Sequence, residues 1–205
     1  MSLSDRVGAL LVRTAREAIE LFLERGEIMD AQNTEDILSE KRGVFVTLNT
    51  YPNMMLRGCI GFPYPIMPLM EAVIKAAISA AVNDPRFPPL TRGELDNVVV
   101  EVSVLTPPEE IAVSKPSELA KEIVIGRDGL IIESNEGSGL LLPQVAVEEG
   151  WDAEEFLTHL CIKAGLRPTY WLEGRATIKR FTAQIFAEKT PKGDVVEVPL
   201  GAARC

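Results

Sequence analysis

Arg57 and Cys59 lie two residues apart in the apolar stretch MMLRGCIGF, residues 54–62. In an extended strand alternate side chains point to opposite faces, so these two share one face while Leu56 and Ile60 share the other, core-facing one. A cysteine reacts as the thiolate, and a nearby cation lowers its pKa. Arginine keeps its charge at any working pH. The spacing therefore predicts a thiol nucleophile at Cys59, with Arg57 as its activator or as a clamp for an anion.

A second interpretation of the same stretch stays open. Free cysteine often fills a small buried position, so Cys59 is also compatible with a packing role. Gly58 and Gly61 leave room for the close approach of another backbone or of a ligand. A nucleophile also needs a base, and the one histidine, His159, falls toward the polar side of its expected helix. The sequence leaves the base unidentified.

The segment DPRFPPLT, residues 84–91, combines two charges with three prolines. Proline restricts its own backbone and that of the preceding residue, so the segment can hold Asp84 and Arg86 in fixed directions. The pair can frame an anionic substrate, or the two side chains can simply bind each other. Gln144 follows LLLP at the start of an expected short helix. We predict that Asp84, Arg86 and Gln144 bind substrate.

The elements that position these residues follow from periodicity and turn signals. Apolar spacing of 3.6 predicts helices over 3–25 and 68–82, and a capping box at Asp152 begins a third that ends at Ala164. Alternation and turns predict strands over 43–51, 55–61, 97–107, 122–126, 129–134, 139–143, 176–188 and 195–198. Hairpin connections dominate, so the predicted class is α+β with mostly antiparallel sheets packed against helices. The segments GVFVTL and GLIIES each begin a similar strand–strand–helix series, which suggests an internal β-β-α duplication.

Composition narrows the function classes. The chain has 205 residues, 46% of them hydrophobic, and a formal net charge of −9. An acidic protein lacks the basic field that dominates nucleic-acid affinity, so nucleic acid is an improbable partner. No stretch reaches the about 20 apolar residues that span a bilayer, and the N-terminus does not read as a signal peptide, so we expect a cytoplasmic protein. Cys59, Cys161 and Cys205 follow no metal-binding spacing, and neither a metal nor another cofactor is indicated.

Four blocks carry a resemblance to a known family: LRGCIGF (56–62), DPRFPPLT (84–91), LLPQVAVEEGW (141–151) and FLTHLCIKAGL (156–166). Together they resemble the AMMECR-type domain family, named for the chromosomal region of Alport syndrome, mental retardation, midface hypoplasia and elliptocytosis. The resemblance covers nearly the whole chain. It implies a two-lobed α+β fold with a cleft between the lobes, and a functional association with Memo-like and radical S-adenosylmethionine proteins. The pattern of expected helices and strands changes after Pro108. Together with the resemblance, this change predicts a larger lobe of about 1–108 plus 151–205 and a smaller one of about 109–150.

Two functions follow from these observations. The first, which we prefer at this point, is an enzyme with its site in the cleft that acts on a small polar or modified macromolecular substrate, with Cys59 as nucleophile and Arg57 as activator or anion clamp. The second is a non-catalytic module that binds a peptide or protein in the cleft, which the incomplete catalytic set favours. Substrate, reaction type and oligomeric state are not indicated by the sequence.

Overall fold

The computed structural model describes residues 3–31 and 35–199, and its contacts divide the chain into two compact units. The first unit contains the described residues up to Leu105 together with Gln184–Pro199, and the second is Thr106–Ala183. The second unit thus includes 151–183, which the sequence assigned to the larger lobe. The reason is packing, since Phe156, Leu160 and Trp171 are buried in one core with strand residues of the second unit.

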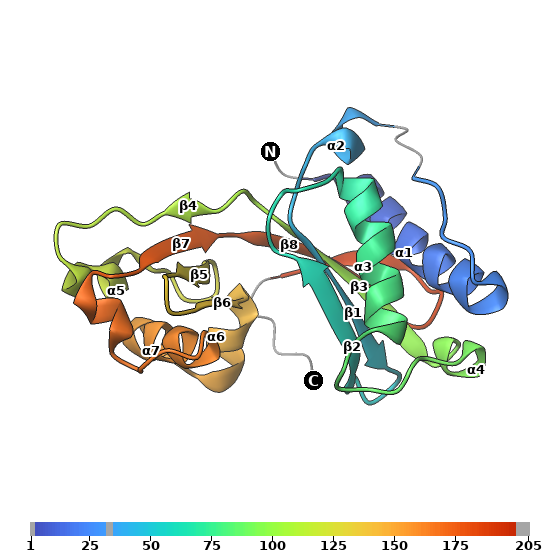
Figure 1. The fold of residues 1–205 in the computed structure, drawn as a ribbon. Helices are drawn as coiled ribbons and strands as arrows, with labels where there is room; N and C mark the ends of the chain where they lie inside the picture. Colours follow the sequence, from blue (N-terminus) through green and yellow to red (C-terminus); the bar gives the residue numbers. More distant parts are fainter. Residues whose placement is uncertain (1–2, 32–34, 200–205) are drawn as a thin grey trace. The chain divides into compact units, whose positions relative to one another are not determined.

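The first unit is a five-stranded antiparallel sheet with helices (Figure 1). The strand order is β2-β1-β3-β8-β9, so β2 is an edge strand. The strands are β1 Val44–Thr50, β2 Leu56–Phe62, β3 Val98–Leu105, β8 Ala183–Glu188 and β9 Val195–Val198. The helices are α1 Asp5–Arg25, α2 Asp36–Ser39, α3 Leu69–Val82 and α4 Arg92–Leu95. Helices α1 and α3 pack on each other and on the sheet, α3 against β1 and β2 and α1 against β3 and β9.

Helix α1 lies within the predicted range 3–25 and has a capping residue at each end. The Ser4 hydroxyl accepts a hydrogen bond from the backbone N–H of Val7, and this satisfies one of the donors left open at a helix N-terminus. Gly26 takes the left-handed conformation with φ of 70°, and its N–H donates to the Phe22 carbonyl. The apolar face between these caps is buried in the first core.

The second unit is a four-stranded antiparallel sheet in the order β4-β7-β5-β6, packed against short helices. Its strands are β4 Glu109–Glu110, β5 Gly129–Glu133, β6 Ser138–Leu141 and β7 Thr177–Phe181. Its helices are η1 Pro116–Glu118, α5 Leu119–Glu122, α6 Pro143–Glu149, α7 Ala153–Lys163 and η2 Tyr170–Glu173. The predicted capping box is present at α7, where the Asp152 carboxylate accepts from Glu155 N–H and the Glu155 side chain accepts from Asp152 N–H. The hairpins β1–β2 and β5–β6 are each followed by a helix, as the internal echo in the sequence suggested.

Two strand predictions are wrong, and both errors have a local cause. Residues 122–126 form the end of α5 and a turn, because the Asp128 carboxylate accepts the N–H of Val124 over 2.9 Å. The predicted strand over 176–188 is two strands, β7 and β8, which belong to different sheets. The break falls at Thr182, whose N–H donates to the hydroxyl of Thr106 over 2.9 Å.

Together, the two antiparallel sheets and the packed helices confirm the predicted α+β class. Among the described residues, no helix is both long enough and apolar enough to cross a membrane.

Candidate functional site

Strand β2 presents Arg57 and Cys59 on the face of the sheet that is turned away from helix α3. Gly58 lies on the other face, where an added Cβ would be 2.2 Å from the carbonyl oxygen of Ala80 in α3. The glycine predicted to admit another backbone therefore admits α3 itself. The Thr47 hydroxyl, opposite Cys59 in the β1–β2 register, donates to the Cys59 Sγ over 3.3 Å. Leu56 was expected to be core, but it is 41% exposed because it begins an edge strand.

Asp84 and Arg86 bind the backbone of Cys59. The Cys59 N–H donates to Asp84 Oδ2 over 2.8 Å, and Arg86 Nη2 donates to the Cys59 carbonyl oxygen over 3.2 Å. Arg86 also reaches both carboxylate oxygens of Asp84, with Nε to Oδ1 at 2.9 Å and Nη2 to Oδ2 at 2.7 Å. The Asp84 side chain is only 2% exposed, whereas that of Arg86 is 52% exposed. The two predicted substrate-binding residues thus bind each other and the strand that carries Cys59.

This ion pair fixes the charge of Asp84. The hydrogen bonds from Arg86, supported by the Cys59 N–H, hold the pKa of the Asp84 carboxyl far below its usual range, although burial opposes them. Asp84 is therefore a buried anion with its partners already in place. It can order β2, and it is poorly placed to take a proton from a ligand.

The thiol of Cys59 is half-buried, and burial raises its pKa above the ordinary cysteine value. The hydrogen bond from Thr47 and the charge of Arg86 act in the opposite direction but do not compensate for the burial. The cation that acts on the thiol is thus Arg86, and the guanidinium of Arg57 is directed elsewhere. At neutral pH this environment favours the protonated thiol over the nucleophilic thiolate.

Arg57 binds Glu94 of helix α4. Its Nε and Nη2 both donate to one carboxylate oxygen, Glu94 Oε1, over 3.2 and 3.1 Å. The Arg57 side chain is 11% exposed, and its guanidinium carbon lies 5.9 Å from the centre of the Phe87 ring. The Arg86 guanidinium lies 5.5 Å from the same ring centre. The guanidinium groups of both predicted site arginines therefore lie close to the ring of Phe87, at distances typical of cation–π contacts.

A pocket of about 360 Å³ opens beside Arg57 in the first unit. Arg57 and Glu94 line it together with hydroxyl, amide and backbone groups from the end of β1, the start of β3 and helix α4. The other lining residues are Thr50, Tyr51, Thr91, Gly93, Asn97 and Val98. Pockets of this size with a few directed polar groups are typical of small-molecule sites.

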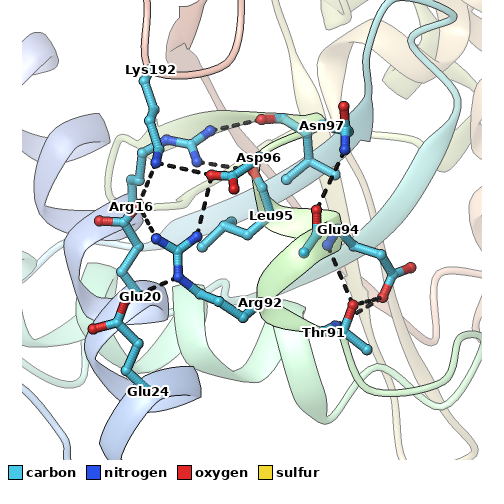
Figure 2. Close-up of polar contacts among 12 residues, drawn as sticks. Arg16, Glu20, Glu24, Thr91, Arg92, Glu94, Leu95, Asp96, Asn97 and Lys192 are labelled. Carbon is cyan, nitrogen blue, oxygen red and sulfur yellow. Dashed lines mark hydrogen bonds and ion pairs between the residues drawn. The ribbon is translucent and has the colours of Figure 1, made fainter.

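Helix α4 has one turn, and side-chain contacts hold it in place (Figure 2). At its start, Glu94 Oε2 accepts from the N–H of Thr91 over 2.8 Å and from the Thr91 hydroxyl over 2.9 Å. These bonds leave Oε1 for Arg57, and the Thr91 N–H, with its hydroxyl and Arg57, holds the pKa of the Glu94 carboxyl below its usual range. On the other side, Arg92 bonds to Glu24 of α1 over 3.0 Å and to Asp96 over 3.2 Å.

Lys192, from the turn between β8 and β9, completes this arrangement by binding Asp96 over 2.9 Å and Glu20 of α1 over 3.2 Å. Figure 2 shows the resulting chain of ion pairs from α1 through α4 to Lys192. Because α4 carries Glu94, these contacts fix the carboxylate that orients Arg57.

Gln144 and His159 lie in the second unit, on α6 and α7. The Gln144 Oε1 atom is buried and has no hydrogen-bond partner among the described residues. His159 stacks on Trp151 with ring centres 3.8 Å apart, a packing contact that accounts for its position. Within residues 3–31 and 35–199, no three His, Cys, Asp or Glu side chains gather into a group able to hold a metal ion.

Sequence reasoning missed four polar residues around this site. Thr47 contacts the thiol, and Glu94 binds Arg57. Glu101 and Ser103 are 4% and 1% exposed on β3, and Glu101 is the register partner of Thr47. A polar row, Cys59–Thr47–Glu101, thus crosses three neighbouring strands. The signal was present in VVVEVSVL, where Glu101 and Ser103 interrupt a valine strand at alternate positions.

This chain is similar to known proteins in sequence and in overall fold. The sequence model of the AMMECR1 family matches residues 12–186. Protein MJ0810 of Methanocaldococcus jannaschii is 57% identical over 193 residues, which cover 94% of this chain and 96% of that protein. Protein PH0010 of Pyrococcus horikoshii is 56% identical over 202 residues, covering 97% and 98%. The crystal structure of uncharacterized protein PH0010 has a TM-score of 0.92 to this fold at 55% identity, covering 97% of this chain and 99% of that one.

Proposed function

The chain belongs to the AMMECR1 family, and for this member we propose that the first unit is a binding module for a small polar molecule with an anionic group. Arg57 is the residue that binds the anion, in the role of clamp rather than of thiol activator. The observation that carries the proposal is the nearly buried Arg57 guanidinium, which lines a pocket of about 360 Å³ and has one oxygen of Glu94 as its ionic partner.

The unused donors of Arg57 support an anion as the ligand. Guanidinium carries five N–H groups in a planar fork that matches a carboxylate or a phosphate. Nε and Nη2 share Glu94 Oε1, and no described residue accepts a hydrogen bond from Nη1. A ligand oxygen can therefore bind Nη1 and Nη2 without removing Glu94 from Thr91. Charge-assisted pairs of this kind are stronger than neutral ones, and more so away from water.

The other lining groups support a ligand that is polar over more than its anionic end. Thr50 and Tyr51 carry hydroxyl groups at the pocket, and Asn97 carries an amide. The Glu94 carboxylate is already occupied by two bonds from Arg57 and two from Thr91, and its lowered pKa keeps it charged as the partner that orients Arg57. These groups suit a small hydroxylated or amino acid-like molecule whose anionic end lies at Arg57.

The thiol enzyme is the alternative, with Cys59 as nucleophile. It requires a thiolate, and the raised pKa of Cys59 disfavours one at neutral pH. It also requires a base, and His159 is in contact with Trp151 in the second unit. These two observations favour the binding module.

The test compares ligand retention by matched variants. Wild type, Arg57→Ala, Lys75→Ala and Cys59→Ser are incubated with a cell extract and separately with succinate and inorganic phosphate, then analysed by native mass spectrometry. Lys75→Ala is the control, because this substitution also removes one positive charge, from an exposed ion pair with Glu71 on α3. We expect a noncovalent species that wild type, Lys75→Ala and Cys59→Ser retain and that Arg57→Ala loses.

Two other results would count against the proposal. Equal retention by Arg57→Ala and wild type would remove Arg57 from the binding site. A covalent adduct that is present in wild type and absent from Cys59→Ser would establish the thiol enzyme instead. Arg57→Lys adds detail, since it keeps the charge and loses the planar fork, and it should bind more weakly than wild type.

A further inference from the structure

The second unit contains its own pocket, of about 340 Å³, lined by residues of that unit alone. Four buried apolar side chains line it: Ile111, Leu119, Trp171 and Ile178, each at most 7% exposed. The same four belong to the apolar core of the second unit. The pocket therefore borders that core, and the partly exposed apolar side chains Val113, Pro116 and Ala176 complete its lining.

The pocket exists because two strands separate. Strands β4 and β7 pair through Glu110 opposite Lys179, and the N–H of Ile111 still donates to the carbonyl of Ile178 over 2.9 Å. Beyond this bond the ladder ends, and the segments at Val113 and Ala176 line the pocket. Pro116 of η1 and Leu119 of α5 contribute to the lining (β4, β7 and α5 in Figure 1).

One charge lies at this pocket. Glu110 is the single ionisable side chain among the described residues that line it, and it is exposed. It forms no ion pair with any residue of the described part of the chain, since its register partner Lys179 binds Glu133 over 2.6 Å. A carboxylate without a counter-ion beside an apolar floor complements a cation that carries an apolar body. Trp171 adds an aromatic ring, which also attracts cations.

From this combination we infer that the second unit binds a compact aromatic or branched aliphatic amine. The apolar body packs on Val113 and Pro116 beside Trp171, and the ammonium group lies at Glu110. This site is independent of the anion site proposed at Arg57, because its lining residues all belong to the second unit.

Two probes of similar shape and opposite charge test the inference: phenethylamine and phenylacetate. Trp171 reports binding by fluorescence in a Trp151→Phe variant, because the chain has two tryptophans and Trp151 lies against His159 outside the pocket. Isothermal titration calorimetry on the wild-type protein measures the same affinity without the Trp151→Phe substitution. We expect saturable binding of phenethylamine with a dissociation constant on the order of 1 mM, and binding of phenylacetate weaker by on the order of tenfold.

The variants separate this pocket from nonspecific binding. Glu110→Gln should weaken phenethylamine about threefold to fivefold, the range that an exposed ion pair supplies, while Glu109→Gln, outside the lining, should leave it unchanged. Ala176→Leu should fill the pocket and abolish binding in a protein whose circular dichroism is unchanged. Equal affinity for the two probes, equal effects of Glu109→Gln and Glu110→Gln, or no saturable signal up to about 10 mM would each overturn the inference.

Discussion

The backbone N–H of Cys59 donates a hydrogen bond to Asp84 Oδ2 over 2.8 Å, so a buried carboxylate occupies a place where a further strand would pair with β2. Arg86 accompanies it and binds the Cys59 carbonyl oxygen. An edge strand with open backbone groups invites pairing with other chains. At Cys59 both groups are satisfied by side chains from one short loop, which explains why this loop carries an aspartate and an arginine.

Asp84→Asn should lower the free energy of unfolding by about 1–3 kcal/mol at neutral pH, because it removes the charged acceptor from a buried hydrogen-bond network. Urea denaturation measures the change. Glu71→Gln is the control, since its exposed pair with Lys75 should contribute less than about 0.5 kcal/mol. Equal effects of the two substitutions would contradict the role given to Asp84.

The pH dependence of that difference follows from the lowered pKa of Asp84. A carboxyl with a depressed folded pKa contributes stability above its unfolded pKa of about 3.9, and this stability is lost as the pH falls through the folded pKa. The gap between wild type and Asp84→Asn should be complete at neutral pH and should narrow below about pH 4. A gap that widens with acid would reverse the assignment.

Cys59 should react slowly with iodoacetamide at neutral pH compared with the same residue in urea-unfolded protein, because burial raises its pKa. Thr47→Val removes a hydrogen bond that lowers this pKa, so it should slow labelling at neutral pH and have little effect at high pH. Arg57→Ala should leave the rate unchanged. Peptide mass spectrometry follows each cysteine separately, and slower labelling in Arg57→Ala would restore Arg57 as the activator.

Gly58→Ala should destabilise the first unit by about 1–3 kcal/mol, the usual result of forcing an atom into a packed interior. The added Cβ would be 2.2 Å from the carbonyl oxygen of Ala80, which is backbone and cannot turn aside. Gly93→Ala is the matched control, because nothing lies within 4 Å of its added Cβ and it lies in helix α4. Thermal unfolding should leave Gly93→Ala unchanged or slightly stabilised.

Glu188→Ala should cost about 3–5 kcal/mol, because it leaves the buried guanidinium of Arg16 without its counter-ion. The two side chains are 3% and 7% exposed, and Glu188 also accepts the N–H of Val100 over 3.0 Å. Denaturant unfolding measures the loss, with Glu35→Ala in an exposed pair as control. The double variant Arg16→Met with Glu188→Leu should recover part of the stability, since it buries no charge.

Local sequence signals were sufficient for the elements whose hydrogen bonds close within a few residues. Helix α1, Asp5–Arg25, lies within the predicted range 3–25, and the predicted capping box at Asp152 begins α7. Strand alternation likewise fixed the shared face of Arg57 and Cys59, because the period of two follows from the backbone alone. The error at 176–188 shows the limit, since both halves are strands and only their partners assign them to different sheets.

The partners of the site residues were decided by the tertiary structure. Asp84 and Cys59 are 25 residues apart, and Arg57 and Glu94 are 37 apart, so no local pattern joins them. From the sequence, Arg57 was expected to act on Cys59. In the folded protein the guanidinium of Arg57 binds Glu94, and the cation that acts on the Cys59 thiol is Arg86. A nearby arginine was expected to lower the pKa of Cys59, but burial of the thiol raises it. A pKa and an ion pair depend on the distances and solvent exposure of neighbours that chain folding brings together, and the sequence specifies these only through the complete fold.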